Sequence, residues 1–141
     1  MMTMSIKGSG GSILIEVLGY ERPTESGGSD ANWVNCRVDL SVIPFRGQYN
    51  ASFTTQDFVD FHKELDAIVC GTISKAAFIG DEQSLSFEIE IGARGAAVVT
   101  GEACLLGQPK VAVKFSFETD QSYLQGSLKE LAEVIKQYPV R

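Results

Sequence analysis

Residues 33–53 read WVNCRVDLSVIPFRGQYNASF and decide the fold of this chain. Apolar and polar side chains alternate on both sides of Ile43-Pro44, and a period of two indicates strands with one dry face and one wet face. The apolar positions are Val34, Cys36, Val38, Leu40 and Val42 before this dipeptide, and Phe45, Gly47, Tyr49, Ala51 and Phe53 after it. We therefore predict a β-hairpin that is joined near Ile43-Pro44.

Two helices are predicted where the period changes. After Thr54 the apolar residues recur at helical spacing, and Thr54 with Asp57 resembles a capping box at the helix start. The shared face of this helix holds Phe58, Phe61, Leu65, Ile68 and Val69. Gly71 suits its C-terminal end. A second helix is predicted to begin after Asp120, which is a good N-cap residue, and to stop at Pro139.

The remaining apolar runs complete an α+β pattern. Further strands are predicted near residues 13–20, 75–79, 85–91, 96–103 and 111–117, with turns at 92–95 and 106–109. The glycine-rich stretch Gly8–Gly11 indicates that residues 1–12 are a flexible lead-in. We predict one domain over residues 1–141, in the order βββαββββα. It would be a two-layer structure, with a mostly antiparallel sheet of about seven strands and two helices on one face.

Composition restricts the class of protein. Hydrophobic residues make up 44% and charged residues 21% of 141 residues, which is typical of a globular chain. The net charge of −6, without a basic run, argues against nucleic-acid binding. The three cysteines, Cys36, Cys70 and Cys104, lack the spacing of a disulfide framework or zinc site, which favours buried thiols in a reducing cytoplasm. We expect no signal peptide, membrane span or cofactor.

Few side chains suggest a site. The single histidine, His62, has no catalytic partner at a recognisable spacing. Glu88 and Glu90 share the polar face of one strand, which suits a solvated face, acid–base chemistry or calcium binding. Asp39 would extend them into an acidic binding surface if the strands lie close together. Trp33, at a strand entrance, either anchors a partner or closes the edge of the core.

Several of these pieces, in this order, resemble the WapI-type immunity protein family. The resemblance covers roughly residues 13–137. It is carried by DANWVN at 30–35, FRG at 45–47, TQDF at 55–58, Leu65, the strand at 82–91, and FETDQSYL at 117–124. It implies a bacterial protein that neutralises a toxin domain by tight binding, without chemistry. Because the matching motifs encode strands, turns and caps, the resemblance transfers no binding residues.

The favoured interpretation is a non-enzymatic binding protein whose candidate partner-binding residues are Asp39, Glu88, Glu90 and Trp33. An acidic inhibitor would suit a basic toxin domain. Two other interpretations stay open. One is a small-molecule binder or an enzyme that uses Glu88, Glu90 and His62 in a pocket between the sheet and the helices. The other is a homo-oligomeric structural protein whose exposed edge strands pair between subunits.

Overall fold

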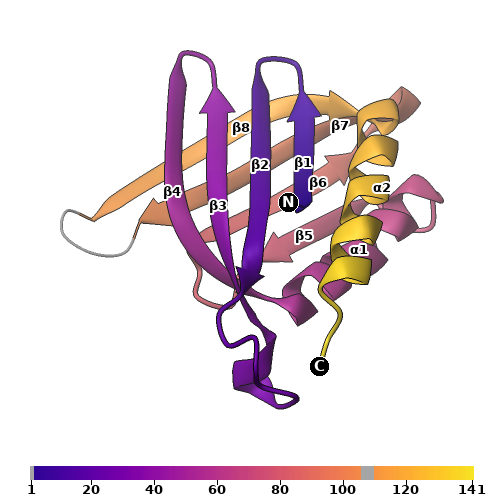
Figure 1. Ribbon diagram of the computed structural model, residues 1–141. Helices are drawn as coiled ribbons and strands as arrows, with labels where there is room; N and C mark the ends of the chain where they lie inside the picture. The colour runs from indigo at the N-terminus through magenta and orange to yellow at the C-terminus, as the bar shows by residue number, and fades with distance from the viewer. Residues whose placement is uncertain (1, 106–109) are drawn as a thin grey trace.

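The computed structural model describes residues 2–105 and 110–141, and this part of the chain forms two four-stranded antiparallel sheets with two α-helices beside them (Figure 1). The first sheet consists of β1 (Met2–Gly8), β2 (Gly11–Tyr20), β3 (Trp33–Val42) and β4 (Phe45–Thr54), in that order. The second sheet consists of β5 (Lys75–Ile79), β6 (Leu85–Ile91), β7 (Ala96–Leu105) and β8 (Val111–Asp120), also in chain order. Helix α1 (Thr55–Val69) follows β4, and α2 (Gln121–Gln137) follows β8.

The predicted α+β class is confirmed, with helices after the first and second groups of antiparallel strands. The prediction of a single sheet of about seven strands covered by both helices was wrong. Alternation identifies the dry face of a strand but not the layer that covers it. Here the inner faces of the two sheets contribute to one shared core, while α2 lies along β1 and α1 lies along β5 and against α2 (Figure 1).

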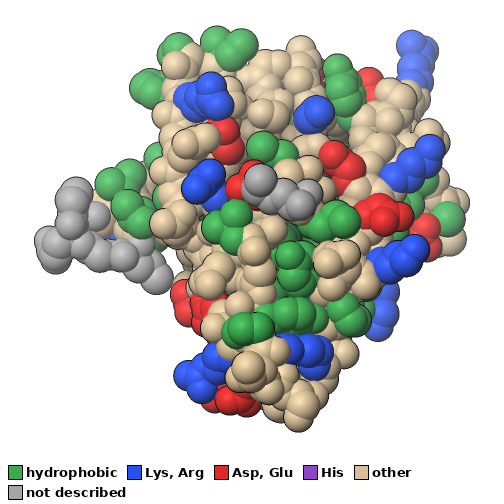
Figure 2. Space-filling model, viewed as in Figure 1, with side chains coloured by type: hydrophobic (Ala, Val, Ile, Leu, Met, Phe, Trp, Pro, Cys, Tyr) green, Lys and Arg blue, Asp and Glu red, His purple; other side chains and the backbone are tan. Residues whose placement is uncertain are grey.

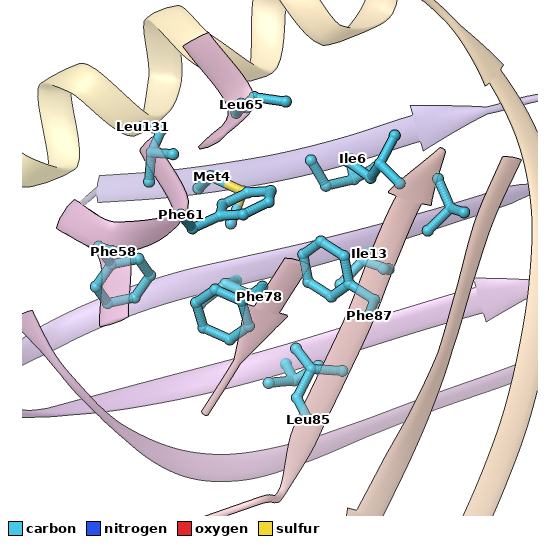
Figure 3. Packing of buried hydrophobic residues seen from close by; sticks show 14 of the residues in the cluster. Met4, Ile6, Ile13, Phe58, Phe61, Leu65, Phe78, Leu85, Phe87 and Leu131 are labelled. Carbon is cyan, nitrogen blue, oxygen red and sulfur yellow. The ribbon is translucent and has the colours of Figure 1, made fainter. Parts of the chain in front are cut away.

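A cluster of phenylalanines fills the centre of this core (Figure 3). Phe78 of β5 stacks on Phe87 of β6, with the ring centroids 5.4 Å apart, and it meets Phe53 of β4 edge-on at 5.2 Å. Phe58 and Phe61 of α1 reach the same ring. The cluster therefore joins both sheets and the first helix.

The predicted helix starts are confirmed. Thr54 and Asp57 form a reciprocal capping box at α1, and the Asp120 side chain accepts a hydrogen bond from the Tyr123 N–H at α2. Beyond α1, Gly71 has a positive φ of 81°, as expected after a helix C-terminus. The preceding residue, Cys70, is exposed because it lies at the helix end, so the expectation of a buried thiol fails there. No described helix is long and apolar enough to cross a membrane.

The prediction of a flexible lead-in over residues 1–12 was also wrong. Met2–Gly8 forms β1 and pairs with β2, because Met4 and Ile6 supply two fully buried side chains to the core. The outer edge of β1 is covered by α2. The Ser5 N–H donates to Glu130 Oε1 at 3.0 Å, and the Ser127 hydroxyl donates to the Ser5 carbonyl.

The first sheet meets β8 closely at the β1–β2 turn. The Ser9 N–H donates to the Glu118 carbonyl at 2.8 Å. A methyl group on Gly8 would lie 1.9 Å from that carbonyl oxygen, and one on Gly11 would lie 2.5 Å from the Phe117 ring. Only glycine permits this approach. The turn predicted at residues 106–109, at the other end of β8, lies outside the described residues.

Candidate partner-binding cleft

A cleft of about 680 Å³ opens where the β3–β4 hairpin and the β7–β8 hairpin face each other. On the first sheet it is bordered by the end of β3 and the first half of β4, and on the second sheet by the end of β7 and the first half of β8. Most of its lining is apolar. The apolar residues that line it are Leu40, Val42, Ile43, Pro44, Phe45, Ala103, Leu105, Val111, Ala112, Val113 and Phe115.

The cleft is an unfilled continuation of the core. Phe45 lies at the start of β4, on the same alternating face as the fully buried Phe53, yet 76% of Phe45 is exposed. Val111 and Val113 share a face with buried Phe117 and are 45% and 40% exposed. Figure 2 shows hydrophobic side chains at the upper end of the first sheet and beside the grey residues at the left. The alternation of apolar residues therefore continues along these strands beyond the region in which the two sheets are in contact.

Tyr49 closes one end of the cleft. Its hydroxyl donates to the Ser84 carbonyl at 2.8 Å and so ties the edge of β4 to the second sheet. Burial raises the pKa of this phenol. Beyond Tyr49 lies a second hollow of about 560 Å³ with a more polar lining, which includes Asn50, Glu82 and Ser84. The buried Ser84 hydroxyl has no hydrogen-bond partner among the described residues.

Main-chain groups of β8 are open along the cleft. The Cys104 N–H donates to the Ser84 carbonyl, so the main-chain N–H and C=O of Cys104 face β6. Cys104 is paired with Ala112 of β8, and the main-chain groups of Ala112 therefore face the opposite, outer edge of β8. The Glu118 carbonyl, six residues along, faces the same outer edge and accepts from Ser9. Alternate residues of a strand face the same edge. Between the start of β8 and Glu118, the main-chain groups of three residues therefore face outward: Ala112, Lys114 and Ser116. Among the described residues, no other element pairs with them.

The cleft lining is uncharged except for two cations. Arg46 and Lys114 line it, and none of its lining residues is a carboxylate. Arg46 donates to Asp39 at 2.9 Å, so this cation is neutralised on the outer side of the first sheet. The acidic balance of the chain therefore resides elsewhere on the surface.

The structure separates the site residues that the sequence suggested. Asp39 lies on β3, where hydrogen bonds from Arg46 and Gln48 lower the pKa of its carboxyl group. Glu88 and Glu90 lie on β6 of the other sheet, and both are paired with Lys75, at 3.7 and 3.2 Å. The hydrogen bond that Lys75 donates to Glu90 is the largest cause of the raised pKa of Lys75. The three carboxylates thus belong to two different sheets and each has a cationic neighbour.

The other two sequence candidates lie apart from the cleft lining. Trp33 is half-buried at the first position of β3, at the end of that strand opposite the cleft. His62 lies on α1 and is half-buried. Both hollows described above are lined by strand and turn residues, whereas the inner face of α1, with Phe58, Phe61 and Leu65, is at most 1% exposed. Both of these openings therefore lie between strands, and no residue of α1 or α2 lines either of them.

The cleft is not predictable from the sequence pattern, because its residues alternate in the same way as residues of a closed core. One signal was present: Ile43-Pro44-Phe45 places three apolar residues together at a hairpin turn, where polar residues are usual.

Comparison with known proteins supplies the family. No curated protein matches the chain. The family described as the Immunity protein WapI-like family matches residues 4–139, which span both sheets, both helices and the cleft. The chain therefore belongs to the Immunity protein WapI-like family.

Proposed function

We propose that this protein is an immunity protein that neutralises a cognate bacterial toxin domain by binding it, and that it carries out no reaction of its own. Membership of the family supports the role in general terms. The observation that suggests where the toxin binds is the apolar cleft between the two hairpins. It would be the surface on which the toxin docks.

Exposure of the cleft residues supports this assignment. Ile43, Phe45, Leu105, Val111 and Val113 are between 40% and 78% exposed and belong to one cleft. Isolated apolar side chains are common on protein surfaces, but a contiguous group marks an interaction site. Burying such a group against a partner would contribute about 25 cal/mol for each Å² removed from water.

The charge of the chain supports a basic toxin. A net charge of −6 would accelerate the encounter with a positively charged domain, an effect that weakens with salt. The cleft itself offers no carboxylate. Attraction over a distance and docking would therefore rest on different parts of the surface. Asp39, Glu88, Glu90 and Trp33 stay predicted contacts of the surrounding surface, outside the cleft lining.

Co-expression tests the proposal. Toxin domains encoded near the gene for this protein are produced in a host with and without the protein, and growth and complex formation are measured. We expect growth to be restored and the two chains to purify together. Phe45→Ser should weaken the complex, while Ile79→Ser should not, because Ile79 is similarly exposed, at 66%, but lies on β5 away from the cleft lining. Absence of a complex with wild-type protein would contradict the immunity role.

A further inference from the structure

We propose that a short extended segment of the toxin pairs with the open edge of β8 inside the cleft and adds a fifth strand to the second sheet. This inference rests on the proposed function and specifies how the partner is held. The occupant is a protein segment, because what the cleft leaves unsatisfied includes main-chain hydrogen-bonding groups as well as apolar surface.

Two of the other sheet edges, those of β1 and β5, carry side-chain covers that the edge of β8 lacks. On β1, α2 supplies Glu130 and Ser127 to the main chain of Ser5. On β5, the Glu64 side chain of α1 accepts from the Ala77 N–H at 3.1 Å. An exposed strand edge invites pairing with another chain, and these contacts block it. The edge of β8 lacks such a side-chain cover from Ala112 to Ser116 among the described residues, and this is the stretch that borders the cleft.

The fold already shows how a strand fits this edge. Ser9 forms an antiparallel bridge with Glu118, further along the same edge of β8. An added strand would continue this pairing from Ser116 towards Ala112. At about 3.3 Å per residue, these five positions span roughly 13 Å, which calls for a segment of about five residues.

Side-chain chemistry defines the segment. Side chains of an added strand that lie opposite Val113 and Phe115 would point into the cleft, towards Phe45, and should be apolar. Because none of the cleft's lining residues is a carboxylate, a lysine or arginine of the segment that pointed into the cleft would lose water without gaining a partner charge. We therefore expect the inward-pointing side chains of the segment to be free of basic residues even within a basic toxin domain. Main-chain pairing would supply affinity, and the apolar pockets would supply specificity.

Amide hydrogen exchange, measured by NMR on the free protein and on its complex with the toxin domain, tests the pairing. In the free protein, the N–H groups of Val113 and Phe115 are bonded to β7 and should exchange slowly, while those of Ala112, Lys114 and Ser116 should exchange quickly. In the complex, we expect amide exchange of Lys114, and of at least one of Ala112 and Ser116, to slow by tenfold or more. Unchanged exchange at all three positions in a stable complex would overturn the inference while the immunity role stands.

A pair of variants provides a second test. Lys114→Pro removes the outward N–H without removing a bond to β7, and proline is tolerated at such positions of edge strands. Lys114→Ala removes the same side chain but keeps the N–H. We expect Lys114→Pro to bind the toxin domain about tenfold more weakly than Lys114→Ala, the effect of one main-chain hydrogen bond. Equal affinities of two folded variants would count against strand addition. If Lys114→Pro does not fold, the amide exchange of the wild-type complex is the deciding test.

Two further outcomes are distinguishable. If wild-type protein forms no complex with the toxin domain, the proposed function fails and this inference fails with it. If the protein alone is a dimer by light scattering, and Ala112, Lys114 and Ser116 are protected without toxin, then a second copy occupies the edge and the inference is overturned.

Discussion

Replacing Glu130 with alanine would uncover the edge of β1, and the structure allows the cost to be worked out. One oxygen of Glu130 accepts from the Ser5 N–H at 3.0 Å and from the Ser5 hydroxyl at 2.6 Å, and Ser5 is only 3% exposed. Hydrogen bonds to a charged group contribute about 1.5–3 kcal/mol each, and a buried donor left without a partner costs about 1–3 kcal/mol. Glu130 itself is partly exposed, which reduces its share. We expect Glu130→Ala to lower the free energy of unfolding by about 2–3 kcal/mol.

Urea unfolding followed by circular dichroism measures this change, with the m-value expected to stay constant. A loss of this size should lower the melting temperature by roughly 6–12 °C in a chain of this length. Glu133→Ala is the matched control, because Glu133 is exposed on the same helix and its replacement should change stability by less than about 0.5 kcal/mol. If both variants unfold at the same urea concentration, the covering of β1 by Glu130 has no energetic weight and the reasoning is refuted.

Three other predictions concern the core, a surface pair and the thiols. Phe78→Ala should lower the free energy of unfolding, measured in urea, by about 3–5 kcal/mol because the ring is fully buried. Ile79→Ala should change this free energy little because this neighbouring side chain is exposed, and equal losses in the two variants would contradict the assigned packing. The hydrogen-bonded carboxyl of Asp39 has a lowered pKa in the folded state, so its stabilisation is complete above the unfolded value of about 3.9 and is lost as pH falls through the folded one. The stability difference between wild type and Asp39→Asn should therefore shrink on acidification below about pH 4, and a difference that is independent of pH would refute this. Iodoacetamide should modify exposed Cys70 well before buried Cys36 in the folded protein, as read by peptide mass spectrometry; equal rates would contradict the burial.

Local structure was largely predictable from the sequence because its determinants are local. The alternation around Ile43-Pro44 predicted the hairpin of β3 and β4, and the Thr54–Asp57 pair predicted the start of α1. These features depend on residues a few positions apart. The pairing of two sheets depends instead on contacts such as Phe53 with Phe78, which the alternation of either strand alone cannot express.

The first strand was missed for a related reason. Met4 and Ile6 are apolar, but Ser5 between them is buried because Glu130 reaches it from the last helix. No residue near Ser5 in the sequence predicts that Glu130 is its partner. The glycines at 8 and 11, which suggested flexibility, are instead required by the close approach of β8.

The sequence could not predict how the charged site candidates lie relative to one another. Asp39, Glu88 and Glu90 were grouped by their shared position on polar strand faces, but those faces belong to different sheets. The cleft is apolar, and Phe45 or Val113 cannot be distinguished from core residues by period alone. Its existence depends on how the two sheets lie relative to each other, which is a property of the whole fold.

The cover on β1 has a consequence for how the protein is made. Ser5 and Glu130 are 125 residues apart, so β1 leaves the ribosome long before α2, which supplies its lateral partner. At about 5–20 residues per second, synthesis leaves that edge bare for roughly 6–25 s. During this interval the nascent chain presents an unprotected strand, and chaperone protection would matter most then. A chain interrupted before α2 would keep the edge bare permanently, which makes incomplete products of this gene prone to aggregation and to degradation.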